Sequence, residues 1–81
     1  TGRDRFVRNA AIAAGNSGDS SLIESLIYLL DDASPLVRGA AIWALAQLDE
    51  NQFSAEKRDR IKFESDESVL LEWDVSAPTA R

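Results

Sequence analysis

Apolar residues recur every three or four positions along most of this chain, which is the spacing of amphipathic helices. In the first such segment Val7, Ala10, Ala11 and Ala14 share one face. Most of that face is alanine, so a neighbouring helix can approach it closely. The pattern predicts five helices, which cover residues 4–17, a second segment from Ser20 or Ser21, a third from Pro35, residues 52–63 and a fifth from Val69.

Capping residues support these boundaries. Gly18 suits the left-handed residue that ends a helix. Ser21, with Glu24 three residues later, predicts a capping box at the start of the second helix. Ser34 predicts an N-cap, and Pro35 follows it at the first helical position.

The fourth helix is the weakest, because it is charged over most of its surface. We expect Phe53, Ile61 and Phe63 to be its few apolar anchors. Its basic residues alternate with acidic ones at helical spacing, which predicts a salt-bridged outer surface. These basic residues are Lys57, Arg58, Arg60 and Lys62.

The chain contains an internal repeat. Residues 6–14 (FVRNAAIAA) align without gaps on residues 36–44 (LVRGAAIWA), and 6 of 13 positions are identical between Phe6–Gly18 and Leu36–Leu48. An offset of 30 residues is typical of a helix–turn–helix unit whose copies stack. The sequence therefore predicts an all-α fold, a short αα-solenoid of about two and a half repeats with four to five helices. We expect it to cover residues 1–75, followed by a flexible tail over 76–81.

Composition narrows the possible functions. The chain has 9 basic and 14 acidic residues, and its net charge of −5 argues against a domain that binds nucleic acid on its own. Residues 1–48 carry 4 basic and 5 acidic groups, a net of −1, and residues 49–81 carry 5 and 9, a net of −4. Because the chain has no cysteine and no histidine, we expect neither a metal site nor a catalytic nucleophile. No apolar run is long enough to span a bilayer, so we expect a soluble, cytoplasmic segment.

Two arginines, Arg8 and Arg38, occupy the same position in successive repeats. In a structural interpretation they pair with Asp31 or Asp32, or with carbonyl groups of the previous turn. In a functional interpretation they contact phosphates along one edge of the solenoid. The structural interpretation is favoured, because stacking itself would require a repeated position.

Arg3 and Arg5 differ from that pair, because no repeat equivalent explains them. A positive charge at the N-terminus of a helix opposes the helix dipole, so neither residue supports its own helix there. This favours an external partner, although a solvated helix start would need the same residues.

Three stretches of the chain are distinctive: residues 3–9 (RDRFVRN), 14–18 (AGNSG) and 34–45 (SPLVRGAAIWAL). Together with the later Glu72-Trp73 pair, they resemble the C-terminal HEAT-like segment of the epoxyqueuosine reductases over roughly residues 3–75. The third stretch is shared with HEAT-like repeats generally, including those of the bilin-lyase type.

The resemblance implies a larger cytoplasmic parent, a cobalamin-dependent oxidoreductase with two [4Fe–4S] clusters that converts epoxyqueuosine in tRNA to queuosine. The ligands of cobalamin and of the clusters would lie upstream of this segment, which has no cofactor of its own. The segment would pack on the catalytic domain and offer a surface to the tRNA anticodon arm. The implied candidates for tRNA contact are Arg3, Arg5, Arg8, Asn9, Asn16 and Arg38.

The chain departs from the repeat pattern in its second half. Leu71 is expected where a third repeat would place its arginine, so the arginine shared by Arg8 and Arg38 occurs in two repeats and not in the third. The acidic half from Asp49 onward suits RNA poorly, so any tRNA should lie toward the N-terminal end. Two alternatives stay open, a scaffold whose concave face binds another polypeptide and a purely structural brace for the parent's catalytic domain.

Overall fold

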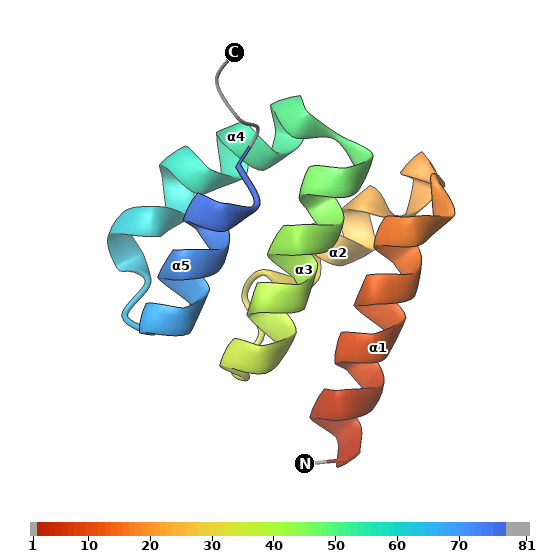
Figure 1. Cartoon of the computed structure of the whole chain (residues 1–81), viewed down its shortest axis with the longest axis horizontal. Coiled ribbons are helices and arrows are strands. Elements are labelled where there is room, and N and C mark those ends of the chain that lie inside the picture. The colour runs from red at the N-terminus through yellow and green to blue at the C-terminus, as the bar shows by residue number, and fades with distance from the viewer. Residues whose placement is uncertain (1, 78–81) are drawn as a thin grey trace.

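The computed structural model describes residues 2–77, and this part of the chain is helical without a β-strand (Figure 1). The all-α prediction with five helices is confirmed. No helix within residues 2–77 combines the length and the apolar composition that crossing a membrane requires. The elements are α1 (Gly2–Ser17), a 3₁₀ turn η1 (Ser20–Leu22), α2 (Ile23–Leu29), α3 (Pro35–Leu48), α4 (Glu50–Arg60), a second 3₁₀ turn η2 (Ile61–Phe63) and α5 (Glu67–Val75).

The helix α3 lies at the centre of the structure and packs against α1, α2, α4 and α5 (Figure 1). A helix surrounded in this way must be apolar on most of its circumference. The sequence meets this requirement with six buried residues along α3, which are Val37, Ala40, Ala41, Ile42, Ala44 and Leu45. The outer helices therefore need only one apolar face each, and they are correspondingly more polar.

The N-caps of α3 and α5 define how the second and third repeats align. Ser34 accepts a hydrogen bond from Val37 N, and Asp66 accepts hydrogen bonds from Ser68 N and Val69 N. Val37 and Val69 each follow their cap by three residues, and both are buried. The offset between these repeats is thus 32 residues. The residue equivalent to Arg38 is therefore Leu70 and not Leu71, which corrects the expected register, and the third repeat still has no arginine there.

The start of the second helix differs from the prediction. Asp19 is the cap, and its carboxylate accepts hydrogen bonds from both the backbone N–H and the hydroxyl of Ser21. The predicted capping box of Ser21 and Glu24 is wrong, because Ser21 donates its hydroxyl proton to Asp19. The chain then passes through η1 before α2 begins at Ile23.

The fourth helix is anchored by one aromatic residue. Phe53 is 1% exposed, and its ring lies 5.3 Å from that of Trp73, centroid to centroid, in a tilted arrangement. Ile61 and Phe63 were expected to be anchors as well, but they are 37% and 80% exposed. The reason is that α4 ends at Arg60 and the chain continues as a 3₁₀ turn, which changes the direction of the following side chains.

The end of α5 bears on the predicted tail. Ala77 is half-buried against the core, whereas residues 78–81 lie outside the described part of the chain. The flexible tail over 76–81 therefore stays a prediction.

Two glycines have clear structural roles, one within α1 and one directly after it. Gly18 has φ of +71°, so the left-handed end of the helix is confirmed. Gly15 is buried where α1 meets α3, and a Cβ atom there would lie 2.7 Å from Trp43 Cζ3 and 2.8 Å from Ala44 Cα. The missing side chain lets the two helices approach closely.

This contact generates a prediction for Gly15→Ala. Helix propensity alone would favour alanine by up to about 1 kcal/mol. The clash with the backbone of Ala44 should outweigh it, so we expect a net loss of about 1–2 kcal/mol in the free energy of unfolding. Gly39→Ala is the matched control, because a Cβ on Gly39 meets nothing within 4 Å and should stabilise α3 by about 0.5–1 kcal/mol. Urea unfolding checks both values, and stabilisation by both variants would contradict the close contact.

Candidate nucleic-acid interface

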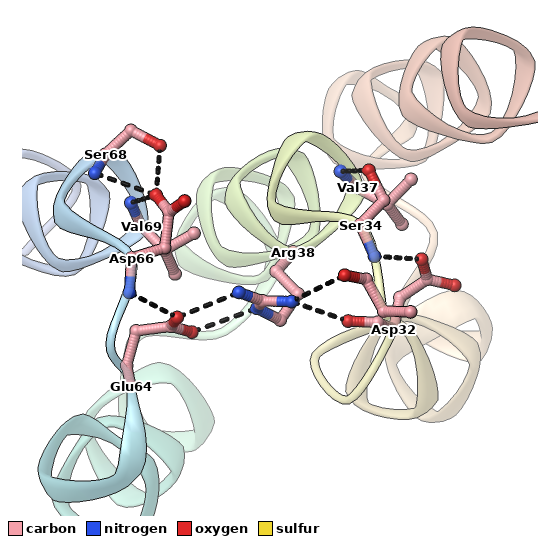
Figure 2. Close-up of polar contacts among 9 residues, drawn as sticks. Asp32, Ser34, Val37, Arg38, Glu64, Asp66, Ser68 and Val69 are labelled. Carbon is pink, nitrogen blue, oxygen red and sulfur yellow. Dashed lines mark hydrogen bonds and ion pairs between the residues drawn. The ribbon is translucent and has the colours of Figure 1, made fainter. Parts of the chain in front are cut away.

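The guanidinium group of Arg38 joins the loop before α3 to the loop before α5 (Figure 2). Its Nε and Nη2 donate to the two carboxylate oxygens of Glu64 at 2.9 and 2.8 Å. Its Nη1 donates to the carbonyl oxygens of Asp32 and Ala33 at 2.8 and 3.1 Å. Only 17% of the Arg38 side chain is exposed. The group is therefore engaged by the protein's own acceptors, as the structural interpretation expected, although Glu64 was not the predicted partner.

Glu64 and Asp32 play equivalent roles in successive repeats. Each lies two residues before an N-cap and accepts that cap's backbone N–H, from Asp66 N at 3.0 Å and from Ser34 N at 2.9 Å. Each also pairs with an arginine from the first helix of the preceding repeat. For Asp32 this arginine is Arg3, whose Nη2 and Nη1 donate at 2.6 and 3.0 Å. We call this arrangement the arginine clasp.

The repeat alignment would give Asp32 to Arg8, because Arg8 is equivalent to Arg38. Arg3 occupies that carboxylate instead, and in the described part of the chain the Arg8 side chain makes one hydrogen bond, from its Nε to Asn9 Oδ1 at 3.1 Å. Within residues 2–77, no carboxylate lies within ion-pair distance of Arg8. The predicted pairing of Arg8 with Asp31 or Asp32 is therefore wrong. Arg3, which the repeat does not explain, therefore completes the clasp, and Arg8, which the repeat does explain, is left without an acidic partner in the described residues.

The tRNA-contact candidates separate into two groups. Arg3 and Arg38 make clasps, although Arg3 remains largely exposed. The other four, which are Arg5, Arg8, Asn9 and Asn16, fall on one stripe of α1 at helical spacing. Arg5, Asn9 and Asn16 are exposed and Arg8 is half-buried. We call these four residues the α1 stripe.

A groove of about 430 Å³ borders the α1 stripe and extends across α3 to α5. Arg8 and Ile12 form its α1 side, and Ser68 and Glu72 form its α5 side. Five residues of α3 line the space between them, namely Pro35, Leu36, Gly39, Ala40 and Trp43. Sequence reasoning missed the contribution of α5, because it depends on which residues face α3 across the stack.

The opposite layer carries part of the predicted salt-bridged surface. Arg60 donates from Nε to Glu56 at 2.8 Å and also pairs with Asp31. Lys62 lies 5.6 Å above the ring of Phe63. Lys57 and Arg58 have no ion pair within the described residues, so the prediction is confirmed only for Arg60.

Within residues 2–77, no group of three or more histidine, cysteine, aspartate or glutamate side chains is placed to bind a metal ion. The whole chain also lacks cysteine and histidine.

The clasp predicts a difference between two equivalent arginines. Arg38→Ala leaves Glu64, which is 10% exposed, without its bidentate partner. We expect a loss of about 2–3 kcal/mol in the free energy of unfolding. Arg8→Ala removes the same charge but no ion pair, and should change that energy by less than about 0.5 kcal/mol. Equal effects of the two substitutions in urea unfolding would refute the assignment of the clasp to Arg38.

Stability should also fall in acid. Hydrogen bonds from Arg3 and from Ser34 N–H lower the pKa of Asp32. Partial burial opposes the shift at Glu64, but hydrogen bonds from Arg38 and Asp66 N–H outweigh it, so the net pKa is lowered as well. A carboxyl group whose pKa is lower in the folded state contributes stability that is complete above its unfolded pKa, and this contribution is lost as the pH falls through the folded value.

The free energy of unfolding should therefore be nearly constant from about pH 7 to pH 5 and decline below about pH 4.5. Glu64→Gln should flatten part of this decline, because the variant has no proton to take up at that position. Urea unfolding at several pH values measures it. An unchanged slope in the Glu64→Gln variant would show that the clasp does not contribute to acid sensitivity.

Comparison with known proteins gives three matches. The family model of HEAT repeats matches residues 3–68 of the chain. The chain is 31% identical over 72 residues to the epoxyqueuosine reductase of Bacillus subtilis (strain 168), with 88% of this chain and 19% of the relative covered. It is 32% identical over 72 residues to an uncharacterized protein in the gldA 3′ region of Geobacillus stearothermophilus, with 88% of this chain and 33% of the relative covered.

No solved structure matches the chain significantly. The resemblance to epoxyqueuosine reductase is confirmed by the curated match, although the chain spans only about a fifth of that protein and a third of the other. The helical stack, the internal repeat and the family match agree with one another. This chain belongs to the HEAT-repeat family.

Proposed function

We propose that this chain is the noncatalytic HEAT-repeat module of an epoxyqueuosine reductase-like iron–sulfur protein, where it helps to position the anticodon arm of tRNA. The match to the reductase of Bacillus subtilis supports a parent of this kind. The observation that carries the RNA-binding part is the α1 stripe, in which Arg5 and Arg8 are free of acidic partners within residues 2–77. Two guanidinium groups a helical turn apart suit contacts with consecutive phosphates.

Charge distribution supports the same end of the molecule. The net charge of residues 1–48 is −1, whereas that of residues 49–81 is −4. Asp32, the acid that the repeat alignment assigns to Arg8, is paired with Arg3 instead. RNA approaching α1 would therefore meet less repulsion than RNA approaching α4 or α5. Arg38 is not part of this proposal, because its donors are engaged by the clasp.

A second part of the proposal is that the segment packs on the parent's catalytic domain. The end face formed by α1 and α2 is apolar, with Ala10, Ala13, Leu22 and Leu29 among its residues. Ala10 is exposed, whereas Ala40, its repeat equivalent in α3, is only 9% exposed because α1 covers it. Symmetry of the stack thus supports a protein surface over this end of the module.

The cofactors of such a parent would be held elsewhere in it. Iron–sulfur clusters are ligated chiefly by cysteine thiolates, and this chain has no cysteine. We propose that cobalamin and the two [4Fe–4S] clusters bind in the catalytic domain and supply the reductive chemistry there. The chain's own residues contribute surface and position, in a cytoplasmic protein.

The alternative is a protein-interaction scaffold. Phe6 is 74% exposed and Leu36 is 44% exposed, and they occupy equivalent positions of the repeat in α1 and α3. Two apolar side chains at repeat spacing favour an apolar protein partner on this edge. Salt dependence separates the possibilities, because phosphate contacts weaken steeply with salt and apolar contacts do not.

The direct test compares the full-length protein that carries this chain with its Arg5→Ala/Arg8→Ala variant in binding to a tRNA anticodon stem–loop. Loss of two phosphate contacts should weaken binding about tenfold at low salt and reduce the salt slope by about 1–2. Fluorescence anisotropy at two or more salt concentrations measures both quantities.

The matched control is Lys57→Ala/Arg58→Ala, which removes the same charge from α4 without breaking an ion pair of the described residues. This variant should bind the stem–loop as tightly as the unmodified protein does. Equal binding by all three proteins, with folding intact, would leave the segment as a scaffold or a brace.

A further inference from the structure

The groove beside the α1 stripe has an unusual division of chemistry. Among the described residues that line it, Arg8 on the α1 side carries the positive charge and Glu72 on the α5 side carries the negative charge. Between them the walls are largely apolar and include Ile12, Leu36 and the half-buried Trp43. A ligand that suits all three regions must carry negative charge at one end, an apolar body and hydrogen-bond donors at the other.

Gly39 borders open space in the groove. A Cβ placed on this residue would meet no heavy atom within 4 Å, so the glycine is not there to relieve a clash with a neighbouring helix. Gly39 differs in this from Gly15, where residues of α3 occupy the space that a side chain would take. The first repeat has Asn9 at the equivalent position, and that larger side chain belongs to the α1 stripe. The absence of a side chain at Gly39 deepens the groove where its walls are apolar.

The α5 side offers hydrogen-bond acceptors. One carboxylate oxygen of Glu72, Oε2, accepts a hydrogen bond from the hydroxyl of Ser76, and this contact restrains the side chain. The other oxygen, Oε1, has no hydrogen bond within residues 2–77. The hydroxyl of Ser68 donates to Asp66 Oδ1 and keeps its acceptor lone pairs. This wall therefore suits an amino group and repels a phosphate.

We propose that the groove accepts an unpaired nucleobase of the RNA whose backbone lies along the α1 stripe. A nucleotide has an anionic phosphate at one end, a planar apolar ring and an amino-bearing edge at the other, which is the order in which the groove presents Arg8, its apolar walls and Glu72. Single-stranded loops are recognised through unstacked bases that pack on aromatic side chains and are read by hydrogen bonds to their edges. This inference rests on the proposed function, because it requires RNA at α1.

The test fills the groove without touching the phosphate contacts. Gly39→Leu places a side chain in the open space, and leucine is a better helix former than glycine. Gly39→Ala adds one methyl group and serves as the matched control. Both variants of the full-length protein are compared with the unmodified protein in binding to an anticodon stem–loop, and to the same stem–loop with abasic sites in its loop.

Gly39→Leu should weaken binding of the intact stem–loop about tenfold, the value expected for one stacked base, and leave the salt slope unchanged. Gly39→Ala fills less of the groove and should weaken binding less than Gly39→Leu does. The abasic stem–loop should bind the unmodified protein about as weakly as the intact one binds Gly39→Leu. Binding should also quench the fluorescence of Trp43, which is half-buried. The fluorescence of Trp73, which is 2% exposed, should not change.

The outcomes separate this inference from the proposed function. Undiminished binding by folded Gly39→Leu, or equally tight binding of the abasic stem–loop, would overturn base insertion while leaving the phosphate contacts in place. The abasic RNA requires no variant, so it decides the question even if Gly39→Leu fails to fold. Absence of any salt-dependent binding by the unmodified protein would overturn both ideas.

Discussion

The structure depends on the burial of α3, because each of the other four helices packs against it. Six of its residues are buried, and four of the six are no larger than valine. Small residues let the helices approach closely, as at Gly15, where Trp43 and Ala44 lie against bare backbone. In this stack the loop before α3 lies within reach of Arg3, and the loop before α5 lies within reach of Arg38.

The two clasps explain how a structural repeat can release a residue for function. Asp32 and Glu64 need an arginine each, and the repeat would supply Arg8 and Arg38. Because Arg3 reaches Asp32, Arg8 has no acidic partner within residues 2–77, and it lies at the junction of an exposed polar stripe and a groove. A position that stacking alone would explain thus acquires a side chain free to meet a ligand. The proposals for RNA contact follow from this exchange of partners.

The sequence predicted the parts of the fold that local chemistry determines. The 30-residue repeat indicated the solenoid, Ser34-Pro35 indicated the start of α3, and Gly18 indicated the end of α1. Long-range partners were not accessible in this way. Nothing local shows that Glu64 rather than Asp31 meets Arg38, because this depends on the 32-residue offset to the third repeat. The apolar spacing likewise suggested Phe63 as an anchor, since it does not reveal that α4 changes to a 3₁₀ turn first.

The most direct measurement of the central claim is an NMR titration that follows the arginine Nε–H signals of the full-length protein as an anticodon stem–loop is added. The account predicts that the signals of Arg5 and Arg8 shift with RNA concentration and that the shifts shrink as salt is raised. The signal of Arg38 should stay in place, because its donors are engaged by Glu64 and two carbonyl groups. A shift of Arg38 with unmoved Arg5 and Arg8 signals would contradict the account.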